Sequence, residues 1–102
     1  MSEFYVLRDK VPVPANLMEW GRFFETPDRV VAQDEINGVR ISTVFLGINH
    51  SFDPHGPPLL FETMIFGGKH DGYQDRCSTW AEAELMHTKA WDLVAGITAA
   101  AQ

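Results

Sequence analysis

The sequence predicts an α+β fold with the order β-α-β-β-β-α, in which an antiparallel sheet carries helices on one face. Two observations lead to this prediction. Three segments rich in β-branched and aromatic residues follow one another without helices between them. An amphipathic helical segment precedes these three strands and a longer one follows them. Because strands do not alternate with helices, the chain favours an antiparallel meander over a parallel α/β sheet.

The N-terminal segment Phe4–Leu7 is short, aromatic and β-branched, which is typical of a strand. Pro12 and Pro14 follow it, and proline is confined to edge strands and strand ends because it lacks a backbone N–H. We therefore expect an edge strand that ends before these prolines.

A short amphipathic helix is predicted at about residues 15–25. Apolar side chains recur at helical spacing from Leu17 to Phe24. Asn16, with Glu19 three positions later, has the spacing of an N-terminal capping box. Pro27 ends the segment.

The strongest local signal is Asn37-Gly38, the dipeptide that most readily adopts the positive φ angles of a two-residue type I′ turn. β-rich runs at 29–36 and 39–48 flank it, so the two runs are predicted to form a hairpin. The second run begins by alternating, with Arg40 and Ser42 on one face, and becomes apolar on both faces toward its end, which indicates central burial. A further strand is expected at 59–66, completing the meander.

The C-terminal helix is predicted at about residues 78–95. Thr79 and Glu82 form a second capping box, and an apolar stripe runs from Ala83 to Ile97. His87 falls on this stripe, so we interpret it as a core histidine whose neutral ring bonds a backbone carbonyl.

Length and charge limit the class of protein. At 102 residues, positions 1–102 are predicted to form one domain. The net charge of −6 argues against direct nucleic-acid binding, because an acidic chain repels the phosphate backbone. No apolar run is long enough to span a membrane. Residues 1–10 carry charges that a signal peptide would lack, and the lone Cys77 forms no internal disulfide, so a reducing cytoplasm is expected.

One candidate ligand or metal site is the loop after the central strand. It carries His50, Asp53 and His55, and imidazole and carboxylate groups bind zinc or manganese. The next turn adds His70 and Asp71, but the two loops should leave opposite ends of an antiparallel sheet. The spacing matches no specific metal signature, and ordinary polar loop residues are the alternative.

Glu62 is the second candidate, since its neighbours within the predicted strand are large and apolar. A carboxylate there needs a partner. Either its face is solvated or Arg40 or Ser42 on the adjacent strand pairs with it. The functional alternative is a general base or ligand anchor, which would require a concave site on the sheet.

No residue is assigned a catalytic role. Cys77 precedes a helix N-terminus and follows Arg76, which should lower the pKa of its thiol, but no base accompanies it. The Gly67–Lys69 segment lacks the spacing of a phosphate-binding loop. No cofactor is therefore expected, apart from the metal considered above, and an enzyme is the less favoured class.

Three stretches carry a resemblance: Ser42–His50, Gly56–Gly68 and Ser78–His87. They resemble a family of small uncharacterised proteins encoded by tailed phages and prophages. The resemblance implies a phage accessory protein expressed in the cytoplasm of a bacterial host. It implies no catalytic residues.

Acidic residues gather in the second half of the chain, at Asp71, Asp75, Glu82 and Glu84. They can serve as favourable charges near a helix N-terminus. In the phage context they can also form an acidic surface that docks on a basic patch of a host protein complex.

These observations leave three functions open. The first is binding of a host macromolecule, inhibiting a defence or nucleic-acid-processing complex. The second is a small metal-dependent or general-base enzyme, or a ligand-binding protein, using His50, Asp53, His55 and Glu62. The third is a virion or assembly component. An exposed strand edge at Phe4–Leu7 or Arg29–Ile36 could also pair two copies as a homodimer.

Overall fold

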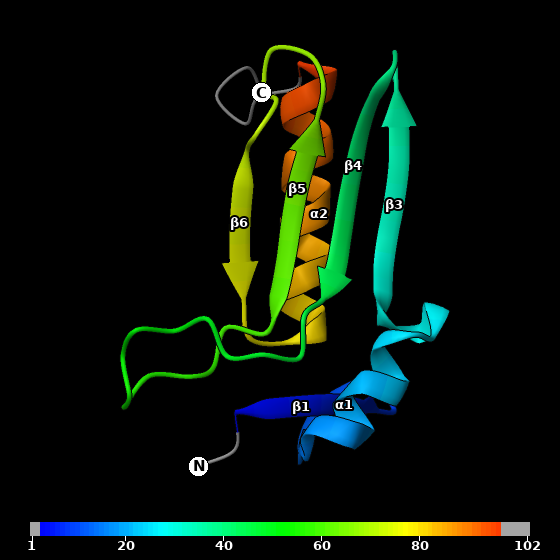
Figure 1. Ribbon diagram of the computed structural model, residues 1–102. Coiled ribbons are helices and arrows are strands. Elements are labelled where there is room, and N and C mark those ends of the chain that lie inside the picture. The colour runs from blue at the N-terminus through cyan, green and yellow to red at the C-terminus, as the bar shows by residue number, and fades with distance from the viewer. Residues whose placement is uncertain (1–2, 97–102) are drawn as a thin grey trace.

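The computed structural model describes residues 3–96 and confirms the α+β class with antiparallel sheets (Figure 1). Ile97, the last position of the predicted apolar stripe, lies outside the described residues. The elements follow one another as β1 (Phe4–Arg8), β2 (Val11–Ala15), α1 (Leu17–Phe24), a 3-10 turn η1 (Pro27–Arg29), β3 (Val30–Ile36), β4 (Val39–Phe45), β5 (Phe61–Phe66), β6 (Gln74–Cys77) and α2 (Trp80–Ala95). The observed order therefore contains two strands, β2 and β6, that the sequence did not predict.

The main sheet is a four-stranded antiparallel meander in the order β3-β4-β5-β6. The predicted turn between β3 and β4 is confirmed, because Asn37 and Gly38 both have positive φ, 51° and 81°. Both predicted capping boxes are also present, at Asn16 for α1 and at Thr79 for α2. Each box satisfies backbone N–H groups at the start of its helix.

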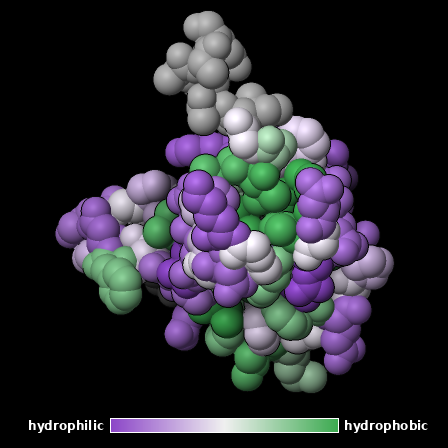
Figure 2. Space-filling model, turned by 90° about the horizontal axis from the view of Figure 1, so that it is seen from above, coloured by the Kyte–Doolittle hydropathy of each residue, from purple (hydrophilic) through white to green (hydrophobic). Residues whose placement is uncertain are grey.

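Helix α2 covers one face of this sheet (Figure 1). Alternate residues of β4 and β5 are fully or almost fully buried beneath it, from Ile41 to Phe45 and from Phe61 to Ile65. The rings of Phe45 and Phe61 lie 5.1 Å apart in this core. Seen from the end at which α2 finishes, a patch of hydrophobic residues lies between hydrophilic flanks, and further hydrophobic residues lie at the lower edge of the view (Figure 2).

The N-terminal segment differs from the prediction. β1 pairs with β2, in a two-stranded sheet of its own, so it is not an edge of the main sheet. Pro12 and Pro14 lie inside β2, and since they alternate along the strand, both missing N–H groups fall on the same edge. On its other side β1 contacts the chain after β4, where the Tyr5 N–H donates to the Gly47 carbonyl at 2.7 Å. The first residues of β1 are therefore flanked by the chain on both sides.

Helix α1 packs on this N-terminal hairpin, whereas the prediction placed both helices on one sheet. The Trp20 indole Nε1 donates to the Leu46 carbonyl at 3.0 Å, and the backbones of Phe4 and Ile48 form an isolated bridge. These bonds attach the hairpin and α1 to the segment that follows β4, below the main sheet in Figure 1.

Candidate functional site

The face of the main sheet opposite α2 is not covered by any other element of residues 3–96 (Figure 1). We call this surface the open face. The strand register determines which side chains lie on the open face, because directly paired residues point to the same side of a sheet. Across the strands, Ser42 pairs with Gln33 on one side and Met64 on the other. The next pairs along are Val44 with Glu62, and Glu62 with Arg76.

A groove of about 280 Å³ crosses the open face. Val44 and Met64 contribute apolar side chains, and Arg29, Arg40, Ser42 and Glu62 contribute polar ones. The concave site that a functional Glu62 requires is therefore present.

Glu62 has the partner that its environment requires. Its side chain is 12 % exposed, and Arg76 Nε donates to its Oε2 at 3.0 Å. Gln74 Nε2 donates to the same oxygen. The prediction that Arg40 or Ser42 pairs with Glu62 is wrong, because Val44 faces it on β4 and the arginine lies on β6, which the sequence did not predict. With two donors on one oxygen, this carboxylate is an ion-paired group and not a free base.

The two arginines that line the groove each lie over an aromatic ring. The guanidinium carbon of Arg29 lies 4.4 Å from the ring centroid of Phe24, and that of Arg40 lies 4.6 Å from the ring centroid of Phe66. Sequence reasoning placed Arg40 on this face by alternation, but only as a possible partner of Glu62. Arg29 was missed, because it lies in a 3-10 turn that no periodic pattern announces.

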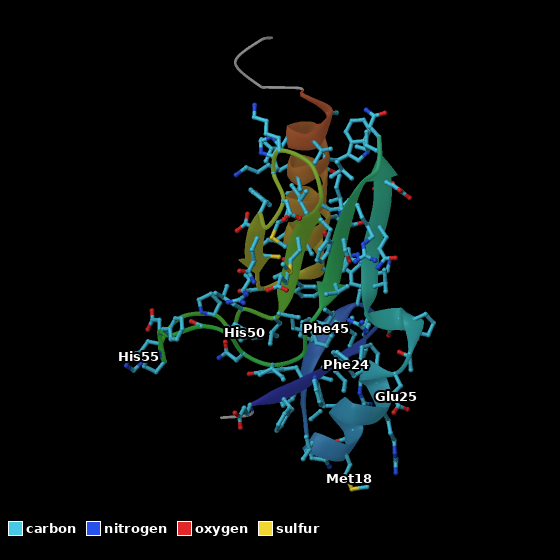
Figure 3. All side chains as sticks on the ribbon, turned by 45° about the horizontal axis from the view of Figure 1, so that its top comes forward. Met18, Phe24, Glu25, Phe45, His50 and His55 are labelled. Atoms are coloured by element: carbon cyan, nitrogen blue, oxygen red, sulfur yellow. The ribbon has the colours of Figure 1, made fainter. Side chains whose placement is uncertain are left out.

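The structure does not bring together the candidate ligands His50, Asp53, His55 and Glu62. The 50–58 loop leaves the body of the molecule, with His55 near its tip and His50 nearer the sheet (Figure 3). Asp53 Oδ1 accepts the His55 backbone N–H at 2.9 Å, so this carboxylate shapes the turn. Within residues 3–96 no group of three His, Cys, Asp or Glu side chains could hold a metal ion.

The second pair of proposed ligands lies elsewhere. His70 and Asp71 occupy the turn between β5 and β6, at the opposite end of the sheet from the 50–58 loop, as expected for antiparallel strands (Figure 1).

The four acidic residues proposed for partner binding do not form one patch. Asp71 lies in the β5–β6 turn, whereas Glu82 lies at the start of α2, at the other end of the molecule (Figure 1). Asp71 accepts the Gly67 N–H, Asp75 accepts the Arg76 N–H, and Glu82 completes the capping box of α2. Glu84 is exposed on α2. Three of the four therefore have a local structural role.

His87 is a core histidine, as predicted, but its partners are side chains and not a backbone carbonyl. Its Nδ1 lies 2.7 Å from Thr43 Oγ1, and its Nε2 lies 2.7 Å from Asp34 Oδ2. Thr43 in turn bonds Thr63. The order hydroxyl, imidazole, carboxylate is that of a catalytic triad, but both threonines are completely buried, so no substrate reaches the hydroxyl groups.

The expectation that Cys77 has a lowered thiol pKa is wrong. Burial, reinforced by the negative charges of Glu82 and Asp75, raises the pKa of Cys77 from 9.0 to about 11, although a bond to the Thr79 backbone opposes the shift. At neutral pH this thiol is protonated and a poor nucleophile.

We expect iodoacetamide at pH 8 to alkylate Cys77 about 100-fold more slowly in the folded protein than in the urea-denatured chain, since the pKa values of about 11 and 9.0 differ by two units. Because the folded state holds the proton more tightly, the thiol stabilises the fold below pH 9.0, and this contribution falls as the pH rises through about 11. Mass spectrometry at successive pH values measures the rate. A plateau near pH 9 in the folded protein would contradict the raised pKa.

No helix within residues 3–96 is both long and apolar enough to cross a membrane. In comparisons with family models, curated proteins and solved structures, nothing matches this chain. The open face is therefore interpreted from its own chemistry.

Proposed function

We propose that this protein is a non-enzymatic phage accessory protein that binds a host protein through its open face. The observation that carries the proposal is the uncovered groove on the sheet. Its lining combines two arginines with Met64, Val44 and Phe66, and it contains no lysine. Arginine, methionine and aromatic residues are enriched in protein interfaces, whereas lysine is depleted there.

The state of the reactive side chains also supports binding over catalysis. The Cys77 thiol is protonated at neutral pH, the Thr43 hydroxyl is buried, and Glu62 is engaged by two donors. A protein of this kind would act on its host by occupying a surface. Inhibition of a defence complex or of a nucleic-acid-processing complex is the form of action that we propose.

The proposal is tested by capture from a bacterial lysate on the immobilised protein. Met64→Lys places a charge in the centre of the groove, and we expect it to reduce capture of the partner more than about tenfold. Leu85→Ser is the matched control, because Leu85 is 72 % exposed on α2, which covers the other face of the sheet. This variant should capture the partner as the parent does.

The thermal midpoints of both variants should match that of the parent. If Met64→Lys unfolds, Val44→Lys replaces it, since Val44 lines the same groove. Equal capture by the groove variant and the Leu85 variant would reject the open face as the binding surface. Quantitative mass spectrometry of the captured proteins provides the measurement.

A further inference from the structure

Arg29 and Arg40 both line the groove. Arg29 lies just before β3, and Arg40 lies within β4. The aromatic rings beneath them restrict the two side chains. The attraction between a guanidinium and the face of an aromatic ring leaves N–H groups of the guanidinium able to donate. Both arginines are therefore positioned donors with capacity to bind a further group.

Neither arginine is neutralised within the described part of the chain, where the two ion pairs are Arg76–Glu62 and His87–Asp34. Glu35 is the direct cross-strand neighbour of Arg40, yet the Arg40 guanidinium lies over the Phe66 ring and forms no ion pair with Glu35. Within the described residues, the groove thus presents two guanidinium groups that have no carboxylate at ion-pair distance, in a chain whose net charge is −6.

The spacing of the two arginines defines what can bind them. Arg40 and Val44 lie four positions apart on β4, about 13 Å in an extended strand. Val30, which follows Arg29, pairs with Val44, so the second arginine lies near this end of the groove. An extended peptide with two acidic residues four positions apart has the same spacing. In such a peptide the side chain midway between the two acidic residues points to the same side as they do, and an apolar one there would lie over Val44 and Met64.

We propose that the open face selects an acidic segment of its protein partner, with one carboxylate bound to Arg29 and another to Arg40. Guanidinium and carboxylate form paired, charge-assisted hydrogen bonds, which explains the choice of arginine over lysine. The proposal rests on the proposed function and specifies the chemistry of its partner. An oligonucleotide fits less well, because its many phosphates would meet the net negative charge of the whole chain.

The test is a titration of the ¹⁵N-labelled protein with a capped peptide of glutamate, serine, leucine, serine and glutamate. We expect saturable shifts of the backbone amides of β4 and β5. The same peptide with glutamine in place of both glutamates should bind about tenfold more weakly or worse. Raising the salt concentration should weaken binding of the acidic peptide and leave the neutral one unchanged.

Arg29→Gln and Arg40→Gln should each weaken the acidic peptide about tenfold without changing the thermal midpoint. Lys89→Gln is the matched control, since it removes the same charge from an exposed position on α2 and should bind as the parent does. Arg40→Lys keeps the charge but not the planar donors, and we expect an intermediate affinity.

Equal binding of the acidic and neutral peptides, or equal binding by Arg40→Gln and Lys89→Gln, would overturn the proposal. If oligothymidylate binds more tightly than the acidic peptide and shifts the same backbone amides, the open face is a nucleic-acid-binding surface and the proposal is overturned. A dimer in sedimentation that the acidic peptide fails to dissociate would replace it with a second copy of the chain.

The experiments distinguish failure of the acidic specificity from failure of the proposed function. If lysate capture depends on Met64 but the acidic peptide does not bind, the acidic specificity falls and the proposed function stands. If the peptide binds as expected but no host protein is captured, the proposed function falls and the acidic specificity stands.

Discussion

Replacing Gly47 by alanine is expected to lower the free energy of unfolding by about 3 kcal/mol. Gly47 has φ +72°, and an added Cβ would lie 2.6 Å from Trp20 Nε1 and 2.7 Å from the Tyr5 carbonyl oxygen. The backbone oxygen cannot move without breaking the contact between β1 and the chain after β4. The cost of a positive φ for alanine and the cost of the steric overlap therefore add, at the point where the N-terminal hairpin and α1 contact the chain after β4.

Gly72→Ala is the matched control, because Gly72 has φ +86° but nothing lies within 4 Å of an added Cβ. Its cost should be about 1 kcal/mol, which is conformational strain alone. Urea denaturation followed by tryptophan fluorescence measures both variants. Equal costs at the two positions would show that the contact with Trp20 is not tight.

His87→Ala is the second substitution with a large expected effect, again about 3 kcal/mol. The substitution leaves a cavity between α2 and the sheet. It also removes His87 Nδ1, which forms a hydrogen bond of 2.7 Å with Thr43 Oγ1. The Thr43 hydroxyl is completely buried, so water cannot replace the lost bond without entering the core. Leu85→Ala on the exposed side of α2 should change stability by less than about 0.5 kcal/mol.

A double-mutant cycle separates the lost bond from the lost volume. Thr43→Val should cost less in the His87→Ala background than in the parent, with a coupling of about 1 kcal/mol or more. Additive costs would mean that the imidazole stabilises the core by packing alone. Urea denaturation of the four proteins gives the coupling.

The elements predicted correctly are those whose signals are local. The Asn37-Gly38 turn and the Asn16 and Thr79 caps each depend on a few adjacent residues, and all three form as expected. β2 was missed because two of its five residues are prolines, which argue against a central strand. β6 was missed because its sequence QDRC lacks an apolar alternation. Both strands are specified by the partner that they pair with.

The candidate site was predicted only in part, because its contacts also depend on residues that are far apart in the sequence. Alternation along β4 placed Arg40 and Ser42 on one face, and the apolar neighbours of Glu62 showed that it needs a partner. The identity of that partner depended on the register of β6. Asp34, the hydrogen-bond partner of His87 Nε2, lies 53 positions before His87 in the sequence. Only the packing of α2 on β3 and β4 brings the two side chains together.

The two prolines of β2 have a consequence for crowded solutions. A free strand edge invites further strands from neighbouring molecules, and this is a common route to aggregation. Pro12 and Pro14 remove two donors from one edge of the hairpin, so a strand added there would lack hydrogen bonds at alternate positions. The N-terminal hairpin can therefore stand apart from the main sheet without acting as a template for fibril growth.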